Sequence, residues 1–552
     1  MFSSFLRQVR ELATSVVVRA NYSIVRVRPS AVMLRARGKS MAAHTALIHC
    51  NADLERGMGH LMRALCLAEE ASSRGWSVDI AGRFGDRAVE HVDELFPGQS
   101  LIQLDASEPR RDLQRLLSER SVDVLHIDSY DTALDGFFPG ATLTSNMQDG
   151  QFGRRPADLH VDGNLDAELR YVPSGQADLA LLGASVVQIR KTMRAISHRV
   201  RPEAELRKRV LVVLGGTDPF DVTPQIVEGL LQLPNVSLTV ICRPEVQPAL
   251  RRSLGDSAGR VNILSFTSDL PRLADSMDAV VTAAGTSVWD FAAAGIPMGI
   301  VAVTENQLPG YRSCEAHGIG FPLGTPPYGD IPNRLEAFAD FLDDTARLSE
   351  SAELGRTLID GRGAWRVVSA WEELLAAGAH SARVEEPVKL AARVAKLSDA
   401  EFLFDWRNDP VTRQVSRSQE PVTWPDHRAW LERVVADENR RLLIIEKAGT
   451  PVATVRWDRR GVTSWEASIT IAPTSRGRGI GKGALAAGED WLVSAEPVQL
   501  LATIHSSNTA SQRLFRGAKY LPYLPADKDG FEMRSKWKLP TEGHAALGDS
   551  PS

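Results

Sequence analysis

Cysteine is scarce in this sequence, and the few that occur form no recognisable cluster. The 552 residues include four cysteines, Cys50, Cys66, Cys242 and Cys314, without a Cys-x-x-Cys pair or histidines at the spacing of a zinc site. We therefore expect no metal centre and a reducing, cytoplasmic environment. Long hydrophobic runs are also missing, because no stretch approaches the roughly 20 consecutive apolar residues that span a membrane. We expect no membrane association.

An excess of positive charge is missing as well. Lysine and arginine total 64 against 69 aspartates and glutamates, which gives a formal net charge of −5. General nucleic-acid binders are usually basic, so we expect no nucleic-acid partner. The apolar fraction of 43% and the charged fraction of 24% are typical of a globular protein. At roughly 100–200 residues per domain, the length predicts three or four compact units.

The first 43 residues differ from the rest of the chain in charge. Arginines recur from Arg7 to Arg37, whereas Glu11 is the only acid. This pattern fits either an organelle transit peptide or an upstream extension of a chain whose functional part begins later. We favour the extension, and we expect residues 1–43 to be disordered and to take no part in the fold.

Between residues 44 and 376, short apolar runs rich in β-branched residues alternate with helical patterns. Such strands, separated by helices, are typical of parallel sheets that are covered on both faces. A charged stretch at 198–209 interrupts the alternation, so we predict two Rossmann-like halves, 44–200 and 201–376, with a cleft between them. Ligands of such sheets bind beyond the carboxyl ends of the strands. The predicted strands are residues 46–50, 78–81, 101–104, 122–127, 210–214, 237–241, 261–264, 279–282 and 298–303.

A second boundary follows these halves. The charged, Ala- and Gly-rich run at 377–388 predicts a linker. From 389 to 539 the pattern changes to α+β, which indicates a separate domain. The tail at 540–552 is polar and is expected to be disordered. The predicted fold class is thus α/β for the paired halves, followed by an α+β domain.

The turn after the first predicted strand carries two glycines and a histidine. Gly57 and Gly59 allow a tight turn and the close approach of a ligand, and His60 falls on the first turn of the next helix. Peptide dipoles at a helix start disfavour a protonated imidazole, so His60 is predicted to be a neutral base. Taken alone, the motif fits a mere turn, with His60 packed locally, equally well.

Polar turns follow further strands in both halves. Because strand ends of this kind border one cleft, we expect these turns to converge there. Gly285, Thr286 and Ser287 begin a helix and offer N–H groups and hydroxyls to an anion, which suits a diphosphate. The other polar residues at strand ends are Asp128, Tyr130, Gly215, Gly216, Thr217, Asn306 and Gln307.

Together these motifs resemble the UDP-sugar hydrolases of pseudaminic acid biosynthesis. The resemblance covers roughly residues 45–375. It implies a glycosyltransferase-B fold, shared with the N-acetylglucosaminyltransferase that makes lipid II, and the release of UDP from UDP-2,4-diacetamido-2,4,6-trideoxy-β-L-altropyranose. The motifs are Gly-x-Gly-His-x-x-Arg at 57–63, Asp-Ser-Tyr at 128–130, Gly-Gly-Thr-Asp-Pro at 215–219, Ala-Gly-Thr-Ser-Val-Trp-Asp at 284–290 and Glu-Asn-Gln at 305–307.

The resemblance also implies roles for single residues. His60 is the general base that activates water at the anomeric carbon, and Tyr130 and Asp128 orient the sugar or the water. Related transferases often hold the ribose with a glutamate at the position of Asp290, which is one methylene shorter. The implied substrate-binding residues are Gly57, Gly59, Arg63, Gly215, Gly216, Thr217, Gly285, Thr286, Ser287, Asp290, Asn306 and Gln307.

A turn rich in glycine and arginine follows a predicted strand of the last domain. Its Arg-x-x-Gly-x-Gly spacing places successive backbone N–H groups around a pyrophosphate at a helix start. With the segments at 508–515 and 517–520, the turn resembles that of the GNAT acetyltransferases, which grips acetyl-CoA. The implied cofactor-binding residues are Ile471, Arg476, Gly477, Arg478, Gly479, Ile480, Gly481, Lys482, Asn508 and Ser511.

Two further residues bear on acetyl transfer. Glu466, on the strand before the turn, is our candidate base for the acceptor amine, and the alternative is an exposed strand carboxylate without a role. Many relatives have a tyrosine at the position of Phe515, which cannot protonate the CoA thiolate. The segments at 405–410 and 427–430 resemble nucleotide-sugar 4-amino acetyltransferases, although ribosomal-protein acetyltransferases have similar patterns.

The two resemblances imply consecutive steps, 4-N-acetylation of a UDP-amino sugar and then loss of UDP. We therefore expect a bifunctional enzyme whose partners are a UDP-sugar and acetyl-CoA. Three alternatives stay open: a sugar transferase, a legionaminic-type hydrolase that epimerises C2, and a non-catalytic sugar-binding scaffold. The sequence does not fix the sugar's stereochemistry or the oligomeric state.

Overall fold

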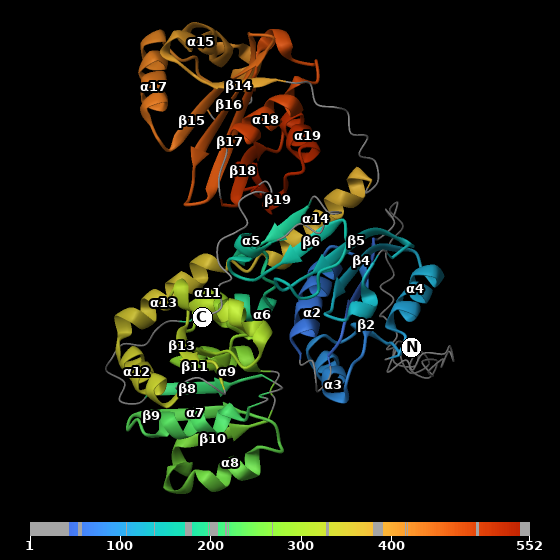
Figure 1. Ribbon diagram of the computed structural model, residues 1–552, viewed down its shortest axis with the longest axis vertical. Helices are drawn as coiled ribbons and strands as arrows, with labels where there is room; N and C mark the ends of the chain where they lie inside the picture. The colour runs from blue at the N-terminus through green and yellow to red at the C-terminus, as the bar shows by residue number, and fades with distance from the viewer. Residues whose placement is uncertain are drawn as a thin grey trace, which may run out of the picture.

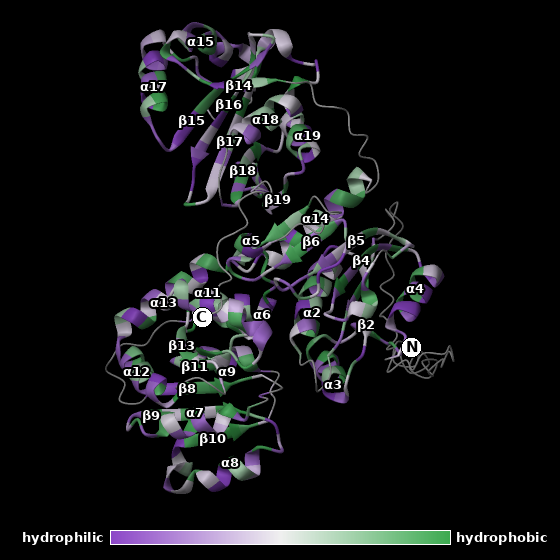
Figure 2. Ribbon diagram, in the orientation of Figure 1, coloured by the Kyte–Doolittle hydropathy of each residue, from purple (hydrophilic) through white to green (hydrophobic). Residues whose placement is uncertain are grey.

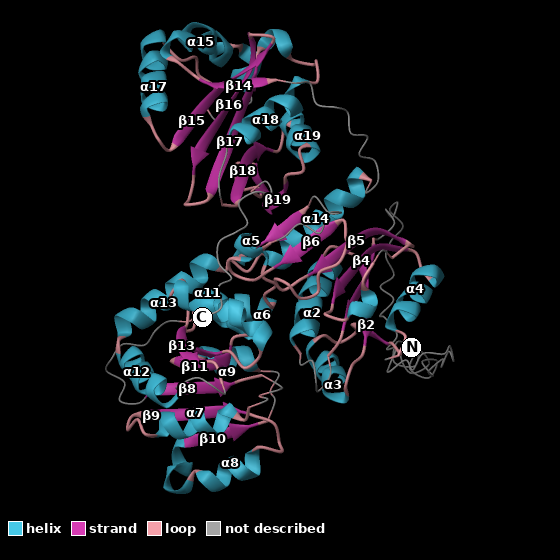
Figure 3. Ribbon diagram, viewed as in Figure 1, coloured by secondary structure: helices cyan, strands magenta, loops and turns pink. Residues whose placement is uncertain are grey.

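The structure is a computed structural model with three β-sheets, each with helices packed against it (Figure 3). It describes residues 44–52, 58–105, 107–136, 138–171, 179–196, 198, 208–215, 218, 220–265, 267, 269–326, 331–378, 390–414, 416, 418–492 and 496–540. The expected N-terminal extension, and nearly all of the expected linker and tail, lie outside these residues. The chain passes from a first half to a second half and then to the C-terminal domain (Figure 1).

The N-terminal half contains a seven-stranded parallel sheet in the order β3-β2-β1-β4-β5-β6-β7. On α2, Leu61, Leu65 and Ala68 recur at helical spacing and are buried against this sheet. The strands are β1 (Thr45–Cys50), β2 (Ser77–Gly82), β3 (Ser100–Gln103), β4 (Val122–Asp128), β5 (Ala141–Met147), β6 (Leu159–Asp162) and β7 (Ala180–Leu182). The helices are α2 (Gly59–Ser73), α3 (Asp86–Leu95), α4 (Pro109–Glu119), α5 (Ala167–Arg170) and α6 (Lys191–Arg194).

The second half contains a six-stranded parallel sheet in the order β10-β9-β8-β11-β12-β13. Helix α12 carries both hydrophobic and hydrophilic residues (Figure 2), and its hydrophobic residues Leu335, Phe338 and Leu342 are buried. The strands are β8 (Lys208–Val213), β9 (Val236–Ile241), β10 (Val261–Leu264), β11 (Ala279–Ala283), β12 (Met298–Val301) and β13 (Phe321–Gly324). The helices are α7 (Val222–Leu231), α8 (Gln247–Ser253), α9 (Leu270–Asp275), α10 (Ser287–Ala294), α11 (Leu308–Ala316), α12 (Ile331–Asp343) and α13 (Thr345–Leu358).

The last helix of this region, α14 (Gly363–Ala377), belongs by its packing to the N-terminal half. Val367, Val368 and Trp371 are fully buried in one hydrophobic cluster with residues of α2 and β1. The sequence boundary at 376 had assigned this segment to the second half. The assignment differs from the packing because an apolar helical face does not reveal which sheet will cover it.

The C-terminal domain has a seven-stranded sheet in the order β14-β15-β16-β17-β18-β20-β19. Only β17 and β18 pair in parallel, and the other described pairs are antiparallel. The strands are β14 (Ala391–Val394), β15 (Arg440–Lys447), β16 (Thr450–Arg459), β17 (Ser464–Ile471), β18 (Val498–His505), β19 (Leu521–Leu524) and β20 (Phe531–Lys538). The helices are α15 (Ala400–Asn408), α16 (Pro410–Gln414), α17 (Trp424–Ala436), α18 (Ile480–Trp491) and α19 (Thr509–Gly517).

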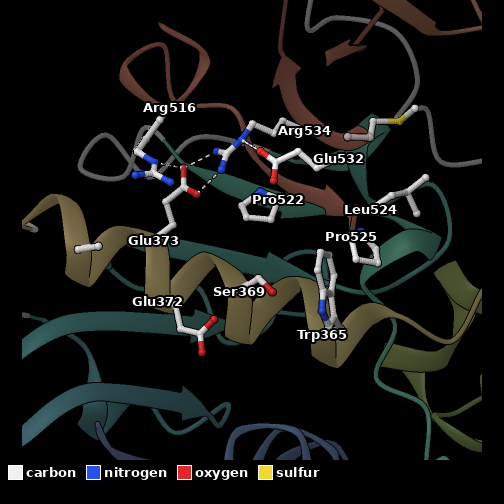
Figure 4. Close-up of a pocket in the computed structure, with 12 residues that line it drawn as sticks. Trp365, Ser369, Glu372, Glu373, Arg516, Pro522, Leu524, Pro525, Glu532 and Arg534 are labelled. Atoms are coloured by element: carbon white, nitrogen blue, oxygen red, sulfur yellow. Dashed lines mark hydrogen bonds and ion pairs between the residues drawn. The ribbon is translucent and has the colours of Figure 1, made fainter. Parts of the chain in front are cut away.

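The C-terminal domain docks on α14 through its strands β19 and β20. Leu521 is buried in the hydrophobic cluster of the N-terminal half. Glu373 accepts hydrogen bonds from both terminal nitrogens of Arg534, at 2.5 and 2.7 Å, and lies 3.6 Å from Arg516. A cavity of about 320 Å³ remains between the helix and the two strands (Figure 4). Helix α14 therefore contacts both the helix that bears His60 and the C-terminal domain.

Candidate functional site

The first candidate site is built around His60 and Asp128. His60 lies on the first turn of α2, and Asp128 is the last residue of β4, the strand beside β1. The imidazole Nδ1 lies 2.6 Å from the carboxylate Oδ1, and the side chains are 12% and 1% exposed. An ionised carboxylate only accepts hydrogen bonds, so Nδ1 carries a proton, and in a neutral imidazole the lone pair is then on Nε2. This is the arrangement that the predicted general base requires.

Arg63 keeps Asp128 ionised. Its Nε and NH2 donate to the two carboxylate oxygens at 3.0 and 2.8 Å. Burial alone would raise the pKa of Asp128, but the charges of Arg63 and His60 and their hydrogen bonds hold it below its usual range. Arg63 NH2 also lies 3.1 Å from Nδ1 of His60, but two N–H groups cannot bond to each other, so this nitrogen serves Asp128. Arg63 thus holds the carboxylate beside His60, and the substrate contact expected of it stays a prediction.

A second carboxylate, which the sequence analysis missed, joins the site beyond Arg63. Asp149 follows β5 and accepts hydrogen bonds from Arg63 NH1 at 2.7 and 3.0 Å. Asp149 also accepts a hydrogen bond from the Tyr130 hydroxyl and one from Nδ2 of Asn164 at 3.0 Å. The Tyr130 ring meets the His60 ring edge-on, with centroids 4.7 Å apart. Asp149 thus connects Tyr130 to the pair of His60 and Asp128.

The start of α10 in the second half faces this site. A Cβ placed on Gly59 would come within 3.1 Å of the Thr286 hydroxyl oxygen, so the first turns of α2 and α10 approach closely. Thr286 is the N-cap of α10, and no side chain caps this end. Helix N-termini attract negative charge, and two of them lie close together here. A diphosphate bound between the halves stays a prediction.

The other predicted substrate-binding residues fall into three groups. Gln307 lies beside Gly285, since a Cβ there would be 3.5 Å from its Nε2, and its Oε1 accepts the Val303 N–H at 3.0 Å. Gly215 and Asn306 are exposed. Gly57, Gly216 and Thr217 lie outside the described residues. Their roles stay predictions.

The Asp290 carboxylate is hydrogen-bonded to Arg190, which directly precedes α6. Its Oδ2 accepts hydrogen bonds from Arg190 Nε at 3.0 Å and NH2 at 2.7 Å. The other oxygen, Oδ1, is buried without a hydrogen-bond partner among the described residues. The ribose contact implied by the resemblance has only Oδ1 available to it and stays a prediction.

The second candidate site lies where β17 and β18 separate. The two strands pair only from Ser464 with Gln499 to Glu466 with Leu501. Beyond this point comes the predicted turn, in which Gly477 and Gly479 both have φ of +72°, a conformation that favours glycine. Gly479 is the N-cap of α18. The turn therefore exposes backbone N–H groups at a helix start, as a pyrophosphate requires.

Several predicted acetyl-CoA contacts have partners inside the protein. Arg476 NH2 lies 2.7 Å from the Asp409 carboxylate and donates to the Thr412 hydroxyl at 2.7 Å, which ties the turn to α16. Asn508 caps α19 by accepting the Ser511 N–H at 3.0 Å. These contacts shape the turn and the helix start. Direct cofactor contacts by these residues stay predictions.

The remaining predicted acetyl-CoA residues divide by exposure. Arg478 and Lys482 are exposed beside the turn, and Ile471 is half-buried at the end of β17. Ile480 is buried at the start of α18, and a Cβ on Gly481 would come 3.3 Å from Leu514 of α19, so this glycine permits a close helix contact. The exposed pair offers positive charge to a phosphate.

Glu466 lies at the point where β17 and β18 separate. Its carboxylate is 14% exposed and pairs with Arg460, at 2.6 Å from Nε and 2.5 Å from NH2. Phe515 is buried edge-on against Tyr520, whose hydroxyl donates to Glu489 at 2.9 Å. Burial, followed by the charge of Glu489, raises the pKa of Tyr520 well above its usual range. Tyr520 thus does not replace the missing tyrosine as an acid.

Membrane spans and metal sites concern the described part of the chain. None of its helices is long and apolar enough to cross a membrane. Its histidines, cysteines and carboxylates form no group of three or more that could hold a metal ion.

Comparisons with known proteins place the fold in context. Residues 389–519 match the family model of the acetyltransferase (GNAT) domain. An uncharacterized protein of Methanocaldococcus jannaschii is 21% identical over 500 residues, which cover 84% of this chain and 93% of that protein. The spore coat polysaccharide biosynthesis protein SpsG of Bacillus subtilis is 24% identical over 172 residues, 30% of this chain and 50% of SpsG.

Among solved structures, MurG of Acinetobacter baumannii covers 60% of this chain and 99% of its own, with 14% identity and a TM-score of 0.42. The sheet orders on their own define two Rossmann-like halves. The chain therefore joins a pair of Rossmann-like halves to a C-terminal α+β domain, of which residues 389–519 match the acetyltransferase (GNAT) family model.

Proposed function

We propose that the chain is a bifunctional nucleotide-sugar enzyme of nonulosonic, specifically pseudaminic, acid biosynthesis. The paired halves hydrolyse a UDP-2,4-diacetamido-2,4,6-trideoxyhexose, and the GNAT domain acetylates the 4-amino precursor from acetyl-CoA. The observation that carries the proposal is the base of His60 and Asp128, 2.6 Å apart, set beside a helix start that suits a diphosphate. The name of the Bacillus subtilis relative, a polysaccharide biosynthesis protein, supports a sugar substrate.

In the proposed hydrolysis, His60 Nε2 takes a proton from water as the water oxygen bonds to the anomeric carbon. The bond from that carbon to the diphosphate oxygen breaks, and UDP leaves. Asp128, held ionised by Arg63, stabilises the imidazolium that forms. The N–H groups at the start of α10 stabilise the charge on the departing diphosphate.

In the proposed acetyl transfer, the acceptor nitrogen attacks the acetyl carbonyl and the thioester C–S bond breaks. The amine must be neutral to attack, and Glu466, where β17 and β18 separate, is positioned to take its proton. This role requires Glu466 to exchange its contact with Arg460 for the substrate. Phe515 has no proton to give, so the thiolate takes its proton from solvent water, and the proton that Glu466 accepts from the amine returns to solvent.

The proposal is tested by supplying UDP-2,4-diacetamido-2,4,6-trideoxy-β-L-altropyranose without any acceptor and measuring free UDP. Release of UDP and of the unchanged altro sugar supports a hydrolase. Release that requires an added sugar acceptor would instead indicate a transferase. A product inverted at C2, detected by NMR, would indicate the hydrolase that also epimerises. Absence of UDP release here, together with absence of acetylation of the 4-amino precursor by acetyl-CoA, would indicate the non-catalytic scaffold.

The order of the two steps is tested in the same system. With the 4-amino precursor as the only sugar, UDP release should depend on added acetyl-CoA, since the hydrolase is proposed to act on the diacetamido sugar. Asp131→Asn provides a control near the site, because the substitution keeps the Asp131 backbone and the side-chain oxygen that accepts the Ala133 N–H. Release from the precursor without acetyl-CoA would contradict the proposed order.

A further inference from the structure

Five side chains around the proposed base form a closed circuit. His60 bonds to Asp128, Asp128 to Arg63, Arg63 to Asp149, and Asp149 to Tyr130. The circuit closes where the Tyr130 ring meets the His60 ring edge-on. Fixing one member therefore restrains the other four.

Asp149 is the member whose two oxygens have different tasks. Oδ1 accepts from Arg63 at 2.7 Å and from Asn164 at 3.0 Å. Oδ2 accepts from Arg63 at 3.0 Å and from the Tyr130 hydroxyl. Although burial raises the pKa of Asp149, the charge and hydrogen bond of Arg63 hold it below its usual value. Asp149 is therefore ionised and can only accept.

The hydrogen bond from Tyr130 to Asp149 determines which hydrogen bonds the Tyr130 hydroxyl can form with a bound molecule. A phenol has one proton to donate and oxygen lone pairs that accept. Because the proton of Tyr130 points to Asp149, only the lone pairs of the hydroxyl oxygen remain for a bound molecule. Tyr130 is half-buried, so part of the residue is accessible to a bound molecule.

We propose that Asp149 is a positioning residue for the hydrolysis, because it makes Tyr130 a hydrogen-bond acceptor for the attacking water. This inference rests on the proposed function. Water has two protons, and it gives one hydrogen bond to His60 Nε2 and the other to the Tyr130 oxygen. Two such bonds leave a lone pair of the water free to face the anomeric carbon, and the base takes its proton as the new C–O bond forms.

The substitution Asp149→Asn tests the inference at a single atom. The amide oxygen belongs at the Oδ1 position, where Arg63 and Asn164 both donate. The NH2 group then replaces Oδ2, points at Tyr130 and donates to its oxygen. The Tyr130 hydroxyl then points its proton away from residue 149, while the hydrogen bond from Arg63 to the oxygen at the Oδ1 position is retained.

The expected result is a loss of about 10- to 30-fold in kcat for UDP release, with KM changed less than about 3-fold, because water is not part of the sugar substrate. Tyr130→Phe should show a similar loss. In the Tyr130→Phe background, Asp149→Asn should cost no more than about 3-fold, since the two act as a unit. Equal losses in both backgrounds would overturn the inference and leave Asp149 with a structural role only.

Two further measurements separate this inference from the proposed function. Asp158→Asn is the matched control, because Asp158 accepts the Thr144 N–H at 2.7 Å and lies outside the circuit. Its kcat should equal that of wild type. A tyrosine hydroxyl that donates to a carboxylate absorbs near-ultraviolet light at a longer wavelength. Asp149→Asn should therefore move the absorption to shorter wavelength when Tyr130 is present. In the Tyr130→Phe background the same substitution should leave the absorption unchanged.

The spectrum needs no substrate. A spectral change with no UDP release by wild type would refute the proposed hydrolase, whereas the hydroxyl orientation would stand. An unchanged spectrum would refute the orientation of Tyr130, whatever the activity.

Discussion

Replacing Asp162 with asparagine should change how the stability of the N-terminal half depends on pH. Asp162 ends β6 and is buried. Burial, followed by the charge of Asp149, raises its pKa from 3.8 to about 6. Its oxygens accept N–H groups of Gly150 at 2.8 Å and of Asn164 at 3.1 and 2.8 Å, but these bonds only partly oppose the effect of burial.

The sign follows from the order of the two pKa values. Because the folded-state pKa lies above the unfolded one, the stabilising contribution of protonated Asp162 is fully present below about pH 4. It is lost as the pH rises through about 6. A rise from 3.8 to about 6 corresponds to about 3 kcal/mol, at about 1.4 kcal/mol per pKa unit. Asparagine keeps one carbonyl oxygen and cannot ionise, so it resembles the protonated acid.

Differential scanning calorimetry of wild type and Asp162→Asn between about pH 4 and 8 measures the effect. As the pH rises between these limits, the unfolding free energy of Asp162→Asn should gain about 3 kcal/mol relative to that of wild type. This change does not depend on any constant offset that the substitution adds. For paired halves that unfold as one unit, this equals about 4 °C in Tm. A difference in Tm that is the same at every pH would refute the reasoning.

Three further predictions concern the C-terminal domain. Gly479→Ala should raise the KM for acetyl-CoA about 10-fold, because a φ of +72° strains an L-residue, and unchanged kinetics would contradict the pyrophosphate assignment. Glu466→Gln should lower the acetylation rate, followed as free CoA thiol, about 100-fold, and full activity would remove Glu466 as the base. Glu373→Gln should destabilise the docked domain by about 3 kcal/mol in calorimetry, because Arg534, 5% exposed, loses the closer of its two charged partners. Glu532→Gln, at 3.2 Å from Arg534 Nε, is the milder control, and equal Tm values for the two variants would contradict this account.

The strands that the sequence predicted are those with continuous apolar runs. Residues 46–50 and 122–127, for example, fall within β1 and β4. The pattern did not reveal β5, because Thr144, Ser145 and Asn146 interrupt it. These side chains are buried with hydrogen-bonding partners, such as His126 for Ser145 and the Gly153 carbonyl for Asn146. A strand whose buried side chains are polar and hydrogen-bonded has no continuous apolar run, so the sequence pattern does not predict it.

The site shows the same division. His60 and Asp128 were recognisable because each stands in a motif at the end of a predicted strand, and the structure brings them to 2.6 Å. Asp149 was missed because the strand before it was missed. Arg63 was expected to bind substrate, but its three guanidinium nitrogens contact Asp128 and Asp149. Spacing in the sequence identifies which residues reach the cleft, and does not say which of them bind one another.

The most direct test of the account compares UDP release from UDP-2,4-diacetamido-2,4,6-trideoxy-β-L-altropyranose by wild type and His60→Ala, without an acceptor. The acetylation activity of the same protein serves as the control for folding. The account predicts that His60→Ala loses UDP release by about 100-fold or more, as expected when a general base is removed, while acetylation continues at the wild-type rate. UDP release by His60→Ala at a rate near that of wild type would contradict the central claim.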